Sequence, residues 1–250
     1  MQLQPKVFLI NLDKSPHRLQ KSSEQLASQN IEFERIQAID GTQLSQNEIA
    51  KHYSPELNKA TYYRNLGYGE IGCYLSHRLA WQKIVENKLP YAIVLEDDFQ
   101  LTGKLLDVFN AINTLQEEWH LLKLANYQKR NKPIKARKPI NGNFELVIHK
   151  KPLTGCCAQA ITLQAATQLL KVTERFGCPV DTQIQRVWQT NVPVFALMPF
   201  VIEQDDKTHS DISNACKGQS IIKHPLKRKV QQLSDAINHA KVNRKIINEF

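Results

Sequence analysis

The sequence of 250 residues has no run approaching the roughly 18 consecutive apolar residues that a membrane-spanning helix requires, so we expect no such helix. An apolar stretch at residues 7–10 is not followed by a small-residue cleavage site, and we therefore expect no signal peptide. The cysteines are five, an odd number, and none forms a C-x-x-C pair. Their pattern favours reduced cytosolic thiols over a disulfide framework, and it speaks against a zinc site.

Several catalytic and nucleotide-binding signatures are also missing. The chain has no Walker or Rossmann glycine pattern, and no nucleophile elbow that would support a Ser-His-Asp triad. It has no internal repeat and no low-complexity tract. Hydrophobic residues at 42% and charged residues at 23% are typical of a globular protein and exclude global disorder.

The formal net charge of +9 suggests a nucleic-acid partner until the charge is located along the chain. Residues 123–151 contain nine Lys and Arg and one acid, and residues 217–250 contain eight Lys and Arg and two acids. These two segments carry +14 of charge, so the remainder carries −5. A mildly acidic body with two basic segments favours contact with a phosphate-rich partner or an anionic membrane surface, and we expect no nucleic-acid binding.

Short apolar segments alternate with segments of helical periodicity. We expect strands at residues 7–10, 91–95, 121–124, 144–149, 157–162 and 193–197, and an extended segment at 31–39. Helices are expected to begin at Ser15-Pro16 and Pro179 and to span about 45–52, 69–86, 105–115 and 164–172, with loops at 58–68 and 128–143. This alternation predicts an α/β fold with a Rossmann-type, mainly parallel sheet flanked by helices. We divide the chain into a domain at 1–217 and a basic amphipathic helical tail at 218–250.

The strongest local signal is the acidic triplet Glu96-Asp97-Asp98, which follows the clearest buried strand. In extended backbone Glu96 and Asp98 would project together and Asp97 opposite. Ligands of such sheets sit at the carboxyl ends of strands, and clustered carboxylates attract Mg²⁺ or Mn²⁺. A solvated acidic turn is the simpler alternative.

Four other segments carry candidate groups, and each has a simpler structural interpretation. Gly69 and Gly72, followed by Ser76 and His77, could receive an anion at a helix start, or the glycines could be packing sites. Asn11 and Arg18 could face one crevice and hold a pyrophosphate, although an ordinary surface arginine is the simpler reading. Asp181 is a helix cap or a catalytic carboxylate. The polar segment 203–211 offers His209 as a candidate metal ligand and Asp205 and Asp206 as further carboxylates.

Taken in order, these motifs resemble glycosyltransferase family 25, the bacterial lipooligosaccharide and lipopolysaccharide glycosyltransferases. The resemblance rests on residues 7–13 with Arg18, 33–41, 69–77, 89–98, 155–161 and 179–181, and it covers roughly residues 6–215. It implies a GT-A-like α/β domain that uses a nucleotide-sugar donor and inverts the anomeric carbon. The triplet E-D-D stands where such enzymes carry a D-x-D metal motif, and it is not a strict D-x-D.

The resemblance leads to an assignment of roles. Metal ligands would be Glu96 and Asp98, with Asp97 as an alternative and His209 as a further candidate, and Mn²⁺ or Mg²⁺ would be the ion. The nucleotide side would be lined by Asn11, Arg18, Glu70, Ser76, His77 and Asp97. The general base would be Asp181, with Asp205 or Asp206 as alternatives.

The expected reaction is transfer of a hexose, galactose or glucose, from a UDP-sugar to a lipooligosaccharide core. The expected place is the bacterial cytoplasm, with the basic loop and tail against the anionic inner face of the inner membrane. The alternatives are a metal-dependent phosphoesterase or nuclease, and a non-catalytic basic binding module. Neither the oligomeric state nor the exact sugar follows from the sequence.

Overall fold

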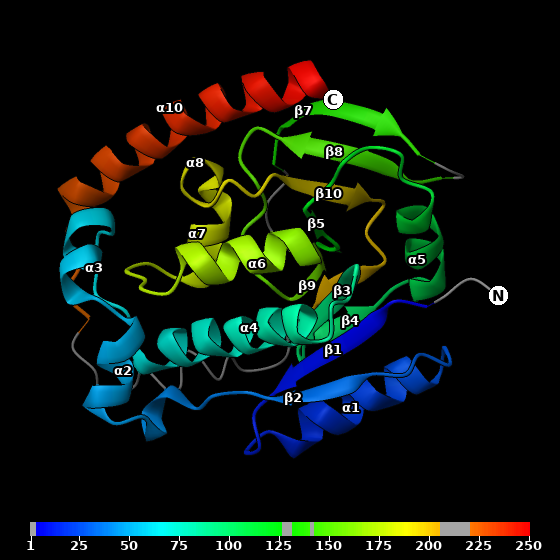
Figure 1. Ribbon diagram of the computed structural model, residues 1–250, viewed down its shortest axis with the longest axis horizontal. Coiled ribbons are helices and arrows are strands. Elements are labelled where there is room, and N and C mark those ends of the chain that lie inside the picture. Colours follow the sequence, from blue (N-terminus) through cyan, green and yellow to red (C-terminus); the bar gives the residue numbers. More distant parts are fainter. Residues whose placement is uncertain (1–3, 127–131, 141–142, 206–220) are drawn as a thin grey trace.

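The computed structural model describes residues 4–126, 132–140, 143–205 and 221–250, and its centre is a twisted eight-stranded sheet (Figure 1). The strands lie in the order β2 (Glu34–Gln37), β1 (Lys6–Asn11), β3 (Tyr91–Glu96), β9 (Ala158–Thr162), β5 (Leu121–Lys123), β10 (Val194–Met198), β8 (Glu145–His149) and β7 (Ile134–Pro139). A second, small sheet is made of β4 (Phe99–Leu101), β11 (Ile202–Gln204) and β6 (Ala125–Asn126).

The sheet is mixed, with two strands that run against the others. Strands β1, β2 and β3 run parallel to one another through β1, and β5 is parallel to β10. Strand β9 is inserted antiparallel between β3 and β5, and β8 and β7 add an antiparallel hairpin at the edge. The α/β class with flanking helices is therefore confirmed, and the expected parallel direction is wrong only for β9 and β8, because β5, β10 and β7 run in the same direction as β1, β2 and β3. Alternation of strands and helices does not itself encode direction, because a hairpin needs no helical crossover.

Helices cover both faces of the sheet (Figure 1). One face carries α4 (Tyr68–Glu86) and α6 (Leu163–Val172), and the other carries α1 (Pro16–Ala27) and α5 (Leu105–Asn113). Alternation along β1 explains the two layers: Phe8 packs in the core with Trp81 of α4, and Leu9 packs in the opposite core with Leu26 of α1. The remaining helices are η1 (Gly41–Gln43, a 3₁₀ helix), α2 (Gln46–His52), α3 (Pro55–Thr61), α7 (Val180–Gln185), α8 (Val187–Thr190) and α10 (Pro225–Glu249).

Two expected loops contain regular structure. Ser54 accepts a hydrogen bond from the Leu57 amide and Pro55 occupies the first turn, so α3 begins before the aromatic segment that we expected to be irregular. The basic segment expected as a loop contains β7, whose burial alternates along the strand. It is the edge strand of the sheet and ends at Pro139. Proline has no backbone N–H to donate, and an edge strand tolerates proline because it has a neighbouring strand on one side only. The helical tail expected from the sequence is confirmed as α10.

Helix α10 crosses one edge of the molecule, from α3 to the region of β7 (Figure 1). Its last turns pack onto the body, where buried Asn243 donates to the carbonyl oxygens of His149 and Lys150 at 3.1 and 3.0 Å. Asp235 lies 3.6 Å from the guanidinium of Arg186. In the described part of the chain, no helix combines the length and the apolar character that crossing a bilayer would need.

Candidate active site

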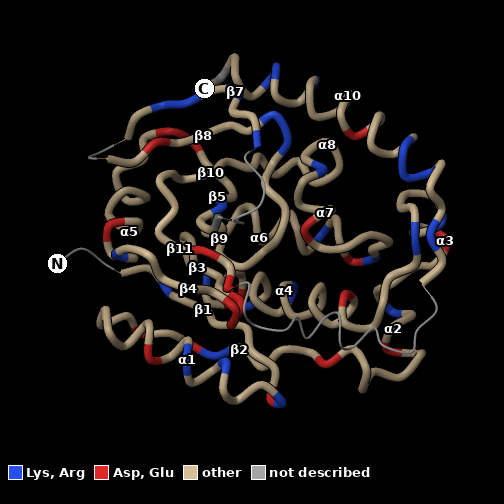
Figure 2. The backbone as a smooth tube through the Cα atoms, turned by 180° about the vertical axis from the view of Figure 1, so that it is seen from behind, with Lys and Arg blue, Asp and Glu red and all other residues tan. Residues whose placement is uncertain are grey.

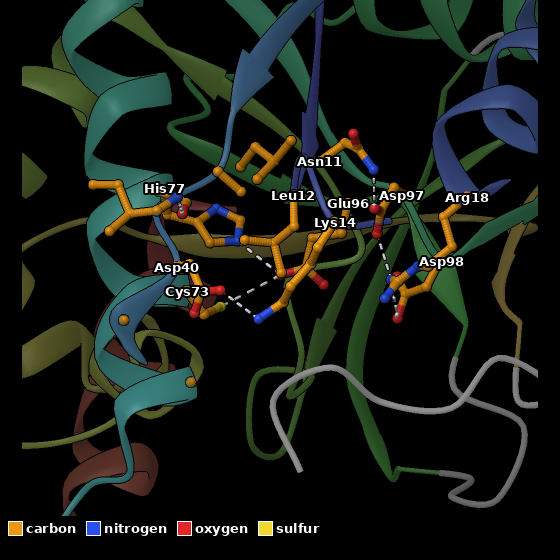
Figure 3. A pocket seen from close by; sticks show the side chains of 16 residues that line it. Asn11, Leu12, Lys14, Arg18, Asp40, Cys73, His77, Glu96, Asp97 and Asp98 are labelled. Atoms are coloured by element: carbon orange, nitrogen blue, oxygen red, sulfur yellow. Dashed lines mark hydrogen bonds and ion pairs between the residues drawn. The ribbon is translucent and has the colours of Figure 1, made fainter. Parts of the chain in front are cut away.

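A pocket opens at the carboxyl ends of β1 and β3 (Figure 3). These strands are parallel and in register, with Ile10 opposite Glu96 and, on the other side of β1, Asn11 opposite Gln37. The chain therefore leaves the sheet at one edge three times, and the side chains that follow each strand meet there. The pocket is lined by residues from β1 and its following loop, from α1, from the segment after β2, from α4 and from the acidic triplet: Ile10, Asn11, Leu12, Lys14, Arg18, Ala38, Ile39, Asp40, Gly41, Gly69, Cys73, Ser76, His77, Glu96, Asp97 and Asp98.

Asp97 is buried and faces α1. One of its carboxylate oxygens forms an ion pair with Arg18, and the other accepts a hydrogen bond from Asn11 Nδ2 at 2.5 Å. Burial raises the pKa of Asp97 to about 6, although Arg18 and Asn11 act in the opposite direction. The three residues that the sequence placed on the nucleotide side are thus brought together.

Asp98 faces the small sheet. Its Oδ2 atom accepts a hydrogen bond from Gln204 Nε2 at 2.8 Å and lies 4.0 Å from the guanidinium of Arg18. The other oxygen, Oδ1, is buried and has no nitrogen or oxygen donor among the described residues. Burial, followed by the charge of Glu96, raises the pKa of Asp98 to about 6. A carboxylate with an uncompensated buried oxygen is a natural cation ligand.

Glu96 faces α4. Its Oε1 atom lies 2.8 Å from His77 Nε2 and 3.8 Å from Cys73 Sγ. Burial would raise the pKa of Glu96, but the hydrogen bond and charge of His77, helped by Lys123 and Arg18, bring it below the ordinary value. The expected arrangement of Glu96 and Asp98 on one side and Asp97 on the other does not apply, because β3 ends at Glu96 and a turn follows. All three carboxylates line the pocket, each with different partners.

Ser76 lines the pocket, but its hydroxyl is used in packing. It donates to the Gly72 carbonyl at 2.7 Å and accepts from the Ile39 amide at 2.8 Å. A Cβ atom on Gly72 would lie 2.4 Å from the Ile39 carbonyl oxygen, so this glycine permits the close approach of α4 to the segment after β2. The packing interpretation therefore holds for Gly72, whereas Gly69 lines the pocket.

Glu70 does not line the pocket, contrary to the role given to it from the family resemblance. Its carboxylate makes two hydrogen bonds to Arg64, at 2.6 and 2.7 Å, and accepts the Gly67 amide at 3.0 Å. It therefore caps the first turn of α4 and holds the preceding loop. Its side chain is committed to the fold.

Two of the candidate bases, Asp181 and Asp205, lie outside the pocket lining. Asp181, in the first turn of α7, accepts hydrogen bonds from the Gly155 amide at 3.2 Å and the Thr182 amide at 2.6 Å. Its charge also contributes to raising the pKa of Cys73, which places it within electrostatic range of the pocket. Asp205 forms an ion pair with Lys21, and its amide donates to the Asp98 carbonyl at 2.7 Å. The other two candidates of this segment, Asp206 and His209, lie outside the described residues.

Sequence reasoning missed four residues at or near the pocket. Lys14 and Asp40 form an ion pair in its lining, and Cys73 stands one helical turn before His77. Lys123 is buried in β5 and donates to the Gly155 carbonyl at 2.7 Å. The signals in the sequence that could have indicated them are a lysine inside an apolar strand and an Asp-Gly pair directly after an extended segment.

A carboxylate-lined pocket at the carboxyl edge of parallel strands defines a ligand-binding α/β protein, and the comparisons with known proteins narrow this class. Residues 4–184 match the model of the family described as glycosyltransferase family 25 (LPS biosynthesis protein), so the chain belongs to glycosyltransferase family 25. The expectation raised by the sequence motifs is thereby confirmed.

Relatives are similar at low identity. A putative glycosyltransferase of Haemophilus influenzae is 26% identical over 254 residues, covering 97% of this chain and 83% of the relative. Procollagen galactosyltransferase 2 of Homo sapiens is 30% identical over 123 residues, covering 46% of this chain and 20% of the human protein. The mouse protein of the same name is 30% identical over 184 residues, covering 70% of this chain and 29% of its own length. The chain thus spans less than a third of these two galactosyltransferases.

Two solved structures are similar at 9% identity. One is a Drosophila beta-1,4-galactosyltransferase 7 in complex with manganese, UDP-Gal and xylobiose, with a TM-score of 0.42 over 87% of this chain and 76% of that chain. The other is a glycosyltransferase involved in glycosylation of the major capsid of PBCV-1, with a TM-score of 0.43 over 85% of this chain and 98% of that chain.

Proposed function

We propose that the pocket at the ends of β1 and β3 binds a nucleotide-sugar donor and transfers its hexose, with inversion, in a GT-A-like arrangement. The observation that carries the proposal is the convergence of Asp97, Asp98 and Glu96 with the cations Arg18 and Lys14 in one pocket. A diphosphate needs positive charge beside it, and a divalent ion needs carboxylates. Both are present within one lining.

The residues fit a divalent cation of the Mn²⁺ or Mg²⁺ type. The pKa values of Asp97 and Asp98 are raised to about 6, and Oδ1 of Asp98 has no nitrogen or oxygen donor in the described chain. A bound cation would therefore stabilise the charged form of these buried carboxylates. Asp98 and Glu96 would hold the ion, because Asp97 is engaged by Arg18 and Asn11. When bound, such an ion neutralises the diphosphate that leaves.

The chain's own residues would then orient the donor and move one proton. Arg18 and Lys14 supply positive charge for the diphosphate, and Asn11, Ser76 and His77 form the walls beside it. Asp181 takes the proton from the acceptor hydroxyl in this proposal, and Asp205 is the alternative base. The effect of the Asp181 charge on the Cys73 thiol, which lines the pocket, supports Asp181 as the base. The hydrogen bond from the Asp205 amide to the Asp98 carbonyl supports Asp205 as the alternative.

The proposed acceptor is a lipooligosaccharide or lipopolysaccharide core, and the proposed sugar is galactose or glucose from UDP. The family description names LPS biosynthesis, and relatives of low identity are named galactosyltransferases. The test is a donor screen with purified protein and truncated core oligosaccharide, run with Mn²⁺ and with EDTA. Transfer from a UDP-hexose that EDTA abolishes supports the proposal. Cleavage of a phosphodiester, with no transfer from any donor, would establish the phosphoesterase alternative instead.

A second surface supports contact with an anionic membrane, proposed here to be the inner leaflet facing the bacterial cytoplasm. On α10 an apolar row is left exposed, from 50% at Ile237 to 80% at Leu226, with Val230 and Leu233 between them. Spacings of four, three and four residues place the row on one helix face.

Basic residues flank this apolar row, and their positive charge favours an anionic lipid surface as the partner of the row. Lys229 is exposed next to the row, whereas Lys227 donates to the Lys59 carbonyl of α3, and Figure 2 shows further Lys and Arg along α10. A helix from a second copy would bring like charges together along the seam, whereas anionic headgroups complement them. One cluster of acids lies near the ends of β3 and β4 and at β11, away from α10 (Figure 2).

A further inference from the structure

Cys73, His77 and Glu96 form a cluster on the α4 side of the pocket (Figure 3). The thiol sulfur, an imidazole nitrogen and a carboxylate oxygen all lie within 4.8 Å of one another. Two elements supply them: Cys73 and His77 project from one face of α4, four residues apart, and Glu96 ends β3. Residues four apart on a helix are a common way to present two ligands to one ion.

The three side chains of the cluster are held by burial and by neighbouring contacts. His77 is buried, with 1% of its side chain exposed, and Cys73 and Glu96 are half-buried and line the pocket. The helix of the first two residues is itself fixed on the segment after β2 by Ser76. The entropy lost when three side chains are ordered usually opposes binding, and packing of these side chains in the fold reduces that loss.

From this geometry we infer a second, softer cation site, made of Cys73 Sγ, His77 Nε2 and Glu96 Oε1 and suited to Zn²⁺. The site shares the Glu96 carboxylate with the proposed Mn²⁺ or Mg²⁺ site, to which Glu96 would offer its other oxygen. One sulfur, one nitrogen and one oxygen ligand match zinc, whereas Mn²⁺ and Mg²⁺ prefer oxygen ligands alone. Three protein ligands leave the fourth position open toward the pocket. On binding, the Cys73 thiol releases its proton to solvent and the sulfur lone pair forms the bond to the ion.

His77 can supply the required lone pair. Its Nδ1 atom is buried and has no hydrogen-bond partner among the described residues, so no contact there fixes the tautomer. In the ion-free protein Nε2 carries a proton and donates it to the Glu96 carboxylate at 2.8 Å. Binding of the ion at Nε2 would replace this hydrogen bond, and the ring would keep its one proton on Nδ1. The spacing of the cysteines in the sequence speaks against zinc sites that are built from several cysteines. The site inferred here uses only Cys73, and cysteine spacing gives no information about a site of that kind.

The test is titration of the metal-free full chain with Co²⁺, kept reduced by a phosphine, and followed in the near ultraviolet. A sulfur-to-cobalt charge-transfer band that Zn²⁺ removes is the expected result, because only a thiolate ligand gives such a band. Cys73→Ser should lose the band, and Cys178→Ser, which alters a buried thiol outside the pocket, should keep it. His77→Gln should weaken Co²⁺ binding at least about tenfold.

Each outcome decides the inference without any assay of sugar transfer, so failure of the proposed activity leaves it intact. A wild-type protein with no band overturns it, and so does a band that survives Cys73→Ser. Thermal melts followed by circular dichroism show whether each variant is folded. If Cys73→Ser does not fold, loss of affinity in His77→Gln supports the site, and unchanged affinity there overturns it.

Discussion

The guanidinium of Arg18 forms an ion pair with Asp97 and lies 4.0 Å from Asp98 Oδ2, so one cation from α1 serves two adjacent carboxylates. The pair Arg18–Asp97 is largely buried, with 17% and 8% of the side chains exposed. A buried charge that loses its partner is costly, and this relationship therefore couples the fold of the pocket to its electrostatics.

Replacing Arg18 with Met should destabilise the protein strongly at pH 8 and less at pH 5. Asp97 would be left charged and unpaired at pH 8, at a cost on the order of 3 kcal/mol, whereas at pH 5 it can take up a proton. Urea denaturation at the two pH values measures the difference. Lys104→Met, at an exposed position before α5, is the control; an equal loss at both pH values would contradict the explanation.

Asp98→Asn should make the metal-free protein more stable at pH 8 than the wild type. The pKa of Asp98 lies at about 6, above its ordinary 3.8, so the folded state holds a proton that the unfolded state releases. This group's contribution to stability therefore falls as the pH rises from about 4 to about 6. Comparing the pH dependence of unfolding for the two proteins isolates that contribution from other carboxylates; parallel curves would refute the assignment.

The same variant, Asp98→Asn, should lower sugar transfer at least about 100-fold in the presence of Mn²⁺, because the ion loses a charged ligand. Initial rates at saturating donor, together with Mn²⁺ affinity by calorimetry, measure the effect. Asp107→Asn, an exposed acid of α5, serves as the matched control. Transfer at the wild-type rate by a folded Asp98→Asn protein would end the proposed metal role.

Glu70→Gln should cost about 1–3 kcal/mol of stability and leave the donor KM nearly unchanged. The substitution breaks the double hydrogen bond to Arg64 and weakens the cap of α4, and neither contact faces the pocket. Denaturation and donor kinetics are measured on the same preparation, with Glu86→Gln at the exposed end of α4 as control. A donor KM raised tenfold without loss of stability would restore Glu70 to the nucleotide side.

Replacing Leu226, Val230 and Leu233 together with Ser should reduce binding to vesicles rich in anionic lipid at least about tenfold, because each exposed apolar side chain contributes to insertion at the interface. Co-sedimentation with anionic and with zwitterionic vesicles provides the measurement. Gln232→Ser, also exposed on α10, should bind as the wild type does. Unchanged binding of the triple variant would remove α10 from the proposed membrane contact, and a shift from dimer to monomer would point to a second copy instead.

The sequence alone was enough for the features that local chemistry controls. Apolar segments such as residues 91–95 must be strands in a buried sheet, and Ser15-Pro16 begins a helix because Pro fits a first turn. The triplet after Leu95 was recognisable as a site because charge clustered at a strand end is unfavourable without a partner. The order of motifs then indicated the family, and residues 4–184 confirm it.

The tertiary structure decided everything that depends on which segments meet. The direction of β9 and of the β7–β8 hairpin is not written in local periodicity, because pairing is chosen by the whole sheet. Glu70 was assigned to the nucleotide side, but the pocket lies at the ends of β1 and β3, and the Glu70 carboxylate instead binds Arg64 and the Gly67 amide in the loop directly before α4. The spacing of the cysteines spoke against a zinc site, and only the end of β3 placed a carboxylate beside Cys73. Local sequence determines the chemistry that a residue can offer, and long-range packing determines which neighbours that residue contacts.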